Sequence, residues 1–437
     1  MTKDFNSTYL YFIAIASAMG GFLFGYDWVV IGGAKPFYEQ FFGIADSPSL
    51  QGWAMASALI GCLVGVMVSG TLSDRYGRKK LLITAAALFM VAAVGTGATS
   101  SFAVFNLFRL LGGVGIGVAS NISPMYIAEV APTNIRGRFV SLNQLTIVLG
   151  ILAAQVVNWL IADAVPAGST AAAILDSWNG QMGWRWMFWA AFVPAVVFFV
   201  AMFTVPESPR WLASRREMQA VAQRRVASPR APKFKGLRRV LVIGVVLAVF
   251  QQWCGINVIF NYAQEVFAAA GYEVTDILMN IVVTGVTNVV FTLVGMALVD
   301  RIGRRALMLF GACGLTIIYA AMGAGYLVGL QGVAMLVLVV LAIAVYAMTL
   351  APVVWVVLSE IFPTRIRGAA MAVSTFALWT ACTLLTYTFP LLNSGLGAAG
   401  TFWVYGGICL AGLIFVKRML PETKGKSLEE LEKILVK

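Results

Sequence analysis

Histidine is absent from this 437-residue chain, and charged residues make up only 11% of it. Soluble globular proteins carry about 25% charged residues. With 60% hydrophobic residues and a mean hydropathy of +0.85, the composition therefore indicates a membrane protein. The five cysteines lie in apolar segments without CxxC spacing, so they read as small apolar residues and not as a disulfide framework. No nucleophile–base pair or cluster of metal ligands is evident. We therefore expect neither an enzyme nor a cofactor or metal site.

The net charge of +12 is concentrated in particular loops. Nearly all of the 31 lysines and arginines lie in the N-terminus, the C-terminal tail or five polar loops, and the exceptions are Lys35, Arg109 and Arg185. These loops alternate with loops almost free of basic residues, which is the positive-inside pattern. This pattern predicts a multi-pass protein of the cytoplasmic membrane with both termini in the cytoplasm. The charge therefore does not indicate binding to nucleic acid.

Long charge-free segments predict the membrane-spanning helices. At about 20 residues per span, the last two segments are each long enough for two spans, which gives twelve spans in an all-α membrane protein. The segments are 5–26, 47–73, 81–108, 110–128, 139–162, 186–206, 240–264, 277–299, 306–359 and 368–416.

Three motifs occur twice along the chain. GTLSDRYGRKK (70–80) returns as GMALVDRIGRR (295–305), and EVAPTNIRG (129–137) returns as EIFPTRIRG (360–368). PESPRW (206–211) has a weaker echo in PETKGK (421–426). The similar offsets indicate two six-helix halves in the same orientation, which is the parallel-repeat arrangement of one class of transporters.

The repeats define four parts of the chain. We expect an N-terminal half at 1–209, a basic cytoplasmic connector at 210–239, a C-terminal half at 240–418 and a cytoplasmic tail at 419–437. The basic connector either contacts anionic membrane lipid or only sets the topology. Ser427 and Glu430 form a capping-box pattern in the tail, which predicts a short amphipathic helix.

Carboxylates and arginines recur together at the predicted cytoplasmic ends of the spans. An interlocked set of such pairs could hold that face closed and would have to break when it opens, so these residues are candidates for a gate. The alternative is ordinary charge at helix ends. The residues are Asp74, Arg78, Glu129 and Arg136 in the first half, and Asp300, Arg304, Glu360 and Arg367 in the second.

Together with RLLGGVGIG (109–117), PESPRWL (206–212) and QQWCGIN (251–257), these duplicated motifs resemble the sugar porter family of the major facilitator superfamily. The resemblance covers nearly the whole chain. It is strongest to bacterial proton-coupled pentose and hexose symporters, with the vertebrate glucose facilitators as more distant relatives. It implies symport of a monosaccharide and a proton by alternating access. The alternatives are a uniporter of the same fold or a sugar sensor that does not transport.

A sugar site needs amide groups for the hydroxyls and aromatic rings for the C–H surface. Gln252 and Asn257 are separated by about 140° around a regular helix, so they converge only if the helix loosens between them, as Gly255 would allow. The alternative for any one amide is a hydrogen bond between helices. The resemblance implies hydroxyl contacts from Gln144, Gln251, Gln252, Asn257, Asn288 and Trp355, and aromatic walls from Phe24 and Trp379.

Several positions depart from the family pattern. Leu378 and Cys382 flank Trp379 where amides are usual, Asn261 replaces a common aromatic residue, and Ala351 replaces a glycine. The sequence therefore leaves the identity of the sugar open.

Asp27 is the single acid of the apolar segment Gly20–Gly33. A carboxylate at the centre of a span costs about 2.5–3.5 kcal/mol to insert, so such residues usually serve a function. An acid near the membrane edge is the plain alternative. The resemblance implies that Asp27 carries the coupled proton and that Arg109, in the fourth span, is its partner. A static ion pair that only fixes the fold is the other possibility.

Overall fold

The computed structural model describes residues 7–131, 136–165, 169–209, 211–213, 215, 238–272, 274–362, 367–424 and 430. These residues form helices and connecting loops, and no β-strand occurs among them. The helices of the first part of the chain are α1 (Ser7–Phe42), α2 (Pro48–Tyr76), α3 (Arg78–Ala98), α4 (Phe102–Val130), α5 (Arg136–Ile161), α6 (Ala171–Asp176), η1 (Asn179–Gly183), α7 (Trp184–Trp189) and α8 (Phe192–Thr204). Those of the second part are α10 (Arg238–Trp253), α11 (Ile256–Asn261), α12 (Ala263–Ala269), α13 (Val274–Ile302), α14 (Arg304–Leu327), α15 (Val333–Met348), α16 (Leu350–Ile361) and α17 (Arg367–Met419).

Eleven helical segments of the described chain are long and apolar enough to cross a membrane. The last of them, Ala370–Met419, has 50 residues. Its backbone leaves the helical conformation at Gly397, where φ is +68°, so it contains two helices. The all-α membrane fold predicted from the sequence is confirmed, and the division of the last segment gives the predicted twelve spans.

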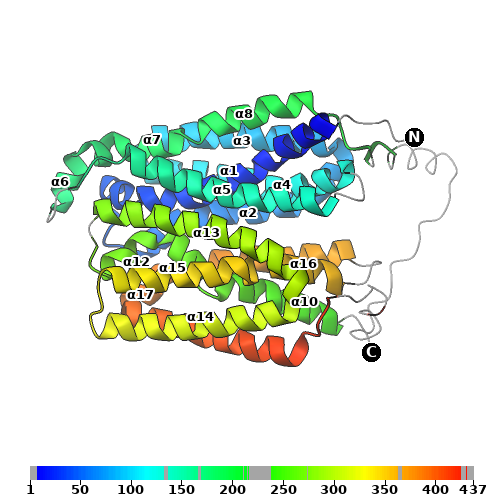
Figure 1. The fold of residues 1–437 in the computed structure, drawn as a ribbon. Helices are drawn as coiled ribbons and strands as arrows, with labels where there is room; N and C mark the ends of the chain where they lie inside the picture. The colour runs from blue at the N-terminus through cyan, green and yellow to red at the C-terminus, as the bar shows by residue number, and fades with distance from the viewer. Residues whose placement is uncertain are drawn as a thin grey trace. The chain divides into compact units, whose positions relative to one another are not determined.

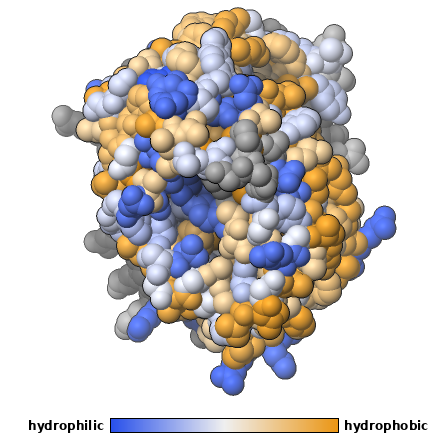
Figure 2. Space-filling view, turned by 90° about the vertical axis from the view of Figure 1, so that its left-hand side faces the viewer, coloured by the Kyte–Doolittle hydropathy of each residue, from blue (hydrophilic) through white to orange (hydrophobic). Residues whose placement is uncertain are grey.

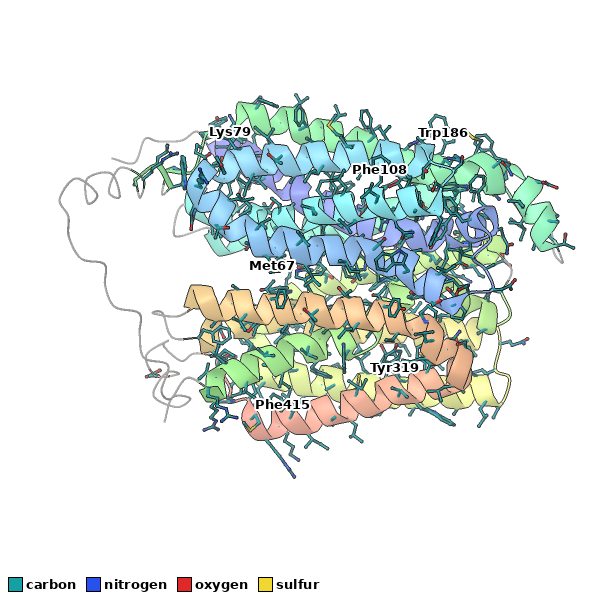
Figure 3. The ribbon with its side chains drawn as sticks, turned by 180° about the vertical axis from the view of Figure 1, so that it is seen from behind. Met67, Lys79, Phe108, Trp186, Tyr319 and Phe415 are labelled. Carbon is teal, nitrogen blue, oxygen red and sulfur yellow. The ribbon has the colours of Figure 1, made fainter. Side chains whose placement is uncertain are left out.

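Two compact units make up the chain. The first comprises Met1–Val30, Ser57–Val157 and Trp184–Pro232, and within it α3 packs against α4, α7 and α8. Lys79 and Trp186 lie at opposite ends of this unit (Figure 3).

The second unit comprises Ile31–Ala56, Asn158–Gly183 and Lys233–Lys437. Within it α14 packs against α15 and α17, and α10 packs against α17 (Figure 1). The last third of α1 and the start of α2 belong to this unit, together with the helices of the second repeat. The predicted division of the chain at residues 210–239 stays a prediction.

Exposed apolar side chains follow one face of α8. Val193, Val197 and Val200 are 66%, 52% and 58% exposed, whereas Phe198 and Met202 on the other face are fully buried. The spacing of three and four residues keeps the exposed valines on one side of the helix. Figure 2 shows hydrophobic residues gathered along the right-hand side of the view. Such a face suits contact with lipid acyl chains and not with water.

The boundary between the third and fourth helices differs from the prediction. The charge-free segments 81–108 and 110–128 meet at Arg109, but α3 already ends at Ala98 and α4 begins at Phe102. Thr99 is extended, with φ −78° and ψ 151°, and this ends α3. Arg109 is buried in the interior of α4. A charged side chain can lie inside a membrane-spanning helix when an opposite charge neutralises it, and Asp27 neutralises Arg109.

The predicted break in the seventh span is present at Gly255. α10 ends at Trp253 and α11 begins at Ile256, with Gly255 between them at φ +86°. A side chain would be strained at this φ, and a Cβ would also lie 2.7 Å from Cγ of Tyr405. Glycine therefore permits both the change of helix direction and the close contact with α17.

Candidate transport site

The predicted pairing of Asp27 with Arg109 is present in the first unit. Nη1 of Arg109 lies 2.8 Å from Oδ1 of Asp27, and Nη2 donates to the backbone oxygen of Asp27 at 3.3 Å. The Arg109 side chain is 3% exposed and the Asp27 side chain 15% exposed. The guanidinium carbon also lies 5.5 Å from the ring centre of Phe188. The pair therefore joins α1 to α4 in an environment that is largely without water.

The pair leaves two polar atoms unsatisfied. Oδ2 of Asp27 and Nε of Arg109 are buried, and neither has a hydrogen-bond partner among the described residues. A buried polar atom without a partner costs about 1–3 kcal/mol. Static ion pairs are stabilising only when their remaining hydrogen-bonding capacity is satisfied. Among the described residues the pair thus keeps one unused acceptor on Asp27 and one unused donor on Arg109, and its role in proton coupling stays a prediction.

In the second unit, the break at Gly255 brings two predicted sugar ligands together. The side-chain nitrogen of Asn257 donates to Oε1 of Gln252 and lies 3.6 Å from Sγ of Cys382. Both amide residues are 8% exposed. The two amide side chains therefore meet beside Gly255, with Cys382 of α17 as their neighbour in place of an amide, and their role in sugar binding stays a prediction. The hydroxyl groups of a ligand can replace this hydrogen bond by binding each amide in place of the other.

Gln251 faces a different partner. Its Nε2 donates to the backbone oxygens of Leu350 and Ala351, at 3.3 and 3.1 Å, at the start of α16. Its Oε1 is buried without a hydrogen-bond partner in the described part of the chain. Gln251 therefore makes the helix-to-helix contact that was the alternative to a sugar contact, and keeps a free acceptor.

The remaining predicted ligands are distributed over both units. Asn288 and Trp379 are buried in the second unit, and Trp355 is partly exposed there. Gln144 and Phe24 belong to the first unit and are partly exposed, and the Phe24 ring packs edge-on against Trp28 at 5.6 Å. The structure leaves the sugar-binding roles of these residues as predictions.

The carboxylate–arginine motifs form an ordered network at one end of the first unit. Arg78 contacts Glu129 with two nitrogens, each at 3.1 Å, and Asp74 and the Ser73 backbone with a third. Bidentate arginine pairs of this kind are short and directional. Glu129 thus pairs with Arg78 of the first motif. The side chain of its expected neighbour Arg136 lies outside the described residues.

The second unit repeats this arrangement. Nη2 of Arg304 lies 2.9 Å from Oε1 of Glu360. The side chains of Asp300 and Arg367 lie outside the described residues. The sequence repeat therefore produces the same arginine–glutamate contact twice, between the start of one helix (α3 or α14) and the end of another (α4 or α16).

Two further carboxylates were missed by the sequence reasoning. Glu207 accepts from the backbone nitrogens of Arg78 and Lys79 at 3.0 and 3.1 Å, and Glu422 accepts from those of Arg304 and Arg305 at 2.9 and 3.1 Å. Each carboxylate thereby covers the N-terminus of α3 or α14, where the helix dipole attracts negative charge. The signal that could have found them is the PES/PET repeat, in which both glutamates follow a proline.

The glycine before each of these helices permits the contact. Gly77 and Gly303 have φ of +96° and +103°, and a Cβ would lie 2.3 Å from Glu207 and 2.8 Å from Glu422. Burial acts to raise the pKa of Glu422, but four backbone N–H donors outweigh it and hold that pKa below its usual value. The carboxylate therefore stays ionised where the helix N-terminus needs it.

A family model described as "Sugar (and other) transporter" matches residues 13–235 and 228–435. The chain belongs to this sugar transporter family. The D-xylose-proton symporter of Escherichia coli (strain K12) is 37% identical to it, over 99% of this chain and 97% of the relative. The arabinose-proton symporter of Bacillus subtilis (strain 168) is 36% identical, over 100% of this chain and 97% of the relative. A solved inward-open structure of the xylose transporter XylE from E. coli matches with a TM-score of 0.83 and 35% identity, covering 98% of this chain and 100% of that one.

These matches confirm several of the predictions made from the sequence. It is a multi-pass membrane transporter with the major facilitator fold, and it is not an enzyme. The resemblance to sugar porters, first drawn from the duplicated motifs, is confirmed over the whole chain.

Proposed function

We propose that this chain imports a monosaccharide together with a proton, by alternating access across the cell membrane. The observation that carries this proposal is the Asp27–Arg109 pair, which is buried in membrane-spanning helices and has an unsatisfied carboxylate oxygen. The named relatives are proton symporters of xylose and arabinose, which supports the same coupling here. Pentoses are therefore the first candidates for the sugar.

The sugar binds, in this proposal, at the amides beside the break in the seventh span. The Asn257–Gln252 hydrogen bond opens, and each amide then contacts a sugar hydroxyl. Cys382 contributes a weakly polar surface at this point. This change from the family pattern reduces the hydrogen bonds available on the α17 side, and we expect it to favour a sugar with fewer hydroxyl groups to satisfy.

The proton acts through the Asp27–Arg109 pair. While Nη1 of Arg109 neutralises the carboxylate, Asp27 remains ionised; when Arg109 moves away, the buried carboxylate loses its counter-charge and binds a proton. One proton moving down a potential of 100 mV supplies about 2.3 kcal/mol. That energy corresponds to about fifty-fold accumulation of a neutral sugar.

The orientation follows from the distribution of charge. Basic loops on the side of both termini support a cytoplasmic position for this side. The Arg78–Glu129 and Arg304–Glu360 contacts then lie at the cytoplasmic ends of their helices. We assign them, with the predicted partners Asp74, Arg136, Asp300 and Arg367, to the elements that rearrange when the cytoplasmic side opens.

Transport by the purified protein in proteoliposomes tests the proposal. Uptake of labelled D-xylose, L-arabinose, D-glucose and a polyol is measured with and without an inward proton gradient. We expect at least one pentose to accumulate above its external concentration only while the gradient lasts. Uptake that is unchanged by a protonophore would identify a uniporter, and sugar binding without flux would identify a sensor. Either result would refute proton-coupled symport.

A further inference from the structure

A second buried ionic cluster lies in α1 and α12 and has no part in the mechanism above. Nζ of Lys35 lies 2.9 Å from Oε1 of Glu39, one turn further along α1, and also pairs with Oε1 of Glu265 in α12. The side chains of Lys35, Glu39 and Glu265 are 4%, 10% and 26% exposed. All three residues belong to the second compact unit. The cluster therefore connects the first helix of the chain to a helix of the second repeat.

The cluster lies at the end of its unit away from the Arg304–Glu360 contact. Tyr326, near the end of α14, donates its hydroxyl to the backbone oxygen of Val266 in α12 at 2.7 Å. Arg304 is the first residue of the same 24-residue helix, and such a helix is about 36 Å long. With the cytoplasmic orientation proposed above, the cluster faces the outside of the cell.

The charges of the cluster do not balance. One ammonium and two ionised carboxylates give a net charge of −1, and Lys35 is their only paired cation in the part of the chain that the structure describes. The other titratable groups around it are Tyr38 on α1, Tyr262 before α12, whose ring centre is 5.5 Å from Nζ of Lys35, and Asp46. None of these supplies positive charge. A buried net charge is costly, so one more positive charge is required.

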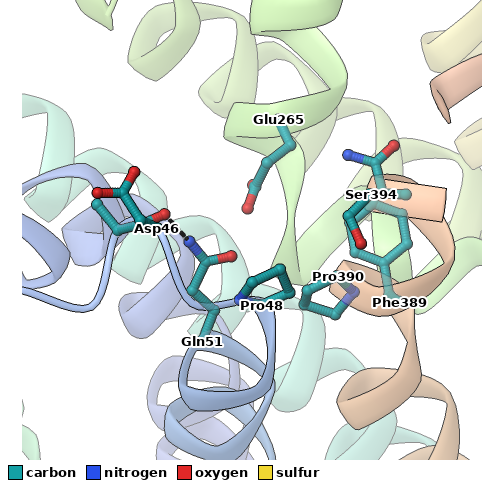
Figure 4. A pocket seen from close by; sticks show the side chains of 9 residues that line it. Asp46, Pro48, Gln51, Glu265, Phe389, Pro390 and Ser394 are labelled. Carbon is teal, nitrogen blue, oxygen red and sulfur yellow. Dashed lines mark hydrogen bonds between the residues drawn. The ribbon is translucent and has the colours of Figure 1, made fainter.

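One carboxylate oxygen of the cluster has room for that charge. Oε2 of Glu265 is buried and has no hydrogen-bond partner among the described residues. Glu265 also lines a pocket of about 160 Å³ together with Asp46, Gln51, Phe389 and Ser394. Figure 4 shows the Glu265 carboxylate directed into this pocket, opposite the Gln51 side chain, which donates to the Ala45 backbone at 2.6 Å. A proton can therefore reach the carboxylate from the pocket without passing Lys35.

We propose that Glu39 and Glu265 share one proton while Lys35 holds α1 against α12, so that the cluster is a second proton-binding site of the transporter. The proton bonds to a carboxylate oxygen and leaves the cluster with no net charge. When α12 separates from α1, the Lys35–Glu39 pair stays neutral, Glu265 meets water, and the proton returns to the same side. The site therefore makes closure of this end dependent on pH without changing the number of protons transported.

This inference rests on the proposed function for its transport readout, so the test removes the other proton site. In an Asp27→Asn background, sugar counterflow needs no net proton movement, and its remaining pH dependence is assigned to the cluster. The rate is measured between pH 5.5 and 8 for Asp27→Asn alone and combined with Glu265→Gln or Glu39→Gln. Asp276→Asn is the matched control, because Asp276 is an exposed acid at the start of α13, near α12 and outside the cluster.

Occupancy of one site changes about tenfold per pH unit away from its midpoint. We expect the counterflow rate to change at least about fivefold across this range in the Asp27→Asn protein and in its Asp276→Asn derivative. We expect less than about twofold with Glu265→Gln or Glu39→Gln. An unchanged pH response in both cluster variants overturns the inference. Failure of the proposed function would appear separately, as wild-type protein that does not accumulate sugar under a proton gradient.

Thermal unfolding in detergent gives a second readout that does not need transport. If the folded cluster binds a proton that the unfolded chain does not, the wild type gains stability relative to Glu265→Gln as the pH falls from 8 to 5. The Asp276→Asn protein is expected to follow the wild type throughout. Parallel curves for wild type and Glu265→Gln contradict a shared proton, whether or not the variant transports sugar.

Discussion

Replacement of Asp27 by asparagine separates the coupling role of the Asp27–Arg109 pair from its structural role. In the wild type, Nη1 of Arg109 lies 2.8 Å from Oδ1 of Asp27. Asparagine keeps the size of the side chain and an oxygen that can accept this hydrogen bond, but it removes the negative charge. The protein is then fixed in a state equivalent to protonated Asp27. A proton gradient can then no longer drive sugar accumulation.

The expected magnitude follows from one proton per cycle. At 100 mV the wild type gains about 2.3 kcal/mol, or about fifty-fold accumulation, whereas Asp27→Asn is expected to reach only equal concentrations on both sides. Breaking a buried pair by removal of one partner costs about 3–5 kcal/mol. We expect a smaller loss here, about 3 kcal/mol or less, because the bond from Nη2 to the backbone oxygen of residue 27 is retained.

The assay compares three measurements on reconstituted Asp27→Asn protein. Sugar binding is measured first, to show that the protein is folded. Counterflow is then expected to persist, since exchange requires no deprotonation, and accumulation under an imposed pH gradient is expected to be lost. Asp276→Asn, which alters an exposed acid, is expected to behave as wild type in all three. A folded Asp27→Asn protein that still concentrates sugar under the gradient would show that the coupled proton binds elsewhere.

The other predictions concern the sugar amides and the two helix N-termini. Gln252→Ala is expected to weaken sugar binding by about 1–3 kcal/mol, because a sugar hydroxyl loses a buried partner. Gln251→Ala removes a hydrogen bond to α16, so it is expected to lower the unfolding temperature more than the affinity for sugar. Titration with sugar measures the affinity of both purified variants. Unaltered affinity in Gln252→Ala would place the site elsewhere. Glu422→Gln is expected to cost about 1–2 kcal/mol of stability at pH 7. Because the pKa of Glu422 is lowered in the fold, this contribution is present above the unfolded pKa of about 4.3 and is lost as the pH falls below it. Unfolding curves of wild type and variant should therefore converge in acid, and a constant difference down to pH 3 would exclude a role for the charge. Gly77→Ala is expected to destabilise the first unit, since φ is +96° and a Cβ would meet Glu207, and a stability equal to wild type would contradict this account of the turn.

Properties that depend on neighbouring residues could be predicted from the sequence. The spans follow from long apolar segments, because each helix satisfies its own backbone hydrogen bonds in lipid. The break at Gly255 follows from one residue that tolerates positive φ, and the occurrence of the same motifs in both halves follows from the repeat. Asp27 stood out because a lone carboxylate in an apolar segment is costly. The family resemblance supplied Arg109 as its partner.

Tertiary structure decided which charges meet. A charge-free run does not reveal that Arg109 lies inside α4, since its neutralising partner is 82 residues away in the chain. Glu129 pairs with Arg78, 51 residues away, and Glu207 covers the start of α3 from 129 residues away. Lys35 and Glu265 are separated by 230 residues, and only the packing of α12 against α1 brings them together. Burial sets the energy of each of these charges, and burial is a property of the assembled helices, so their partners could not be read from local sequence.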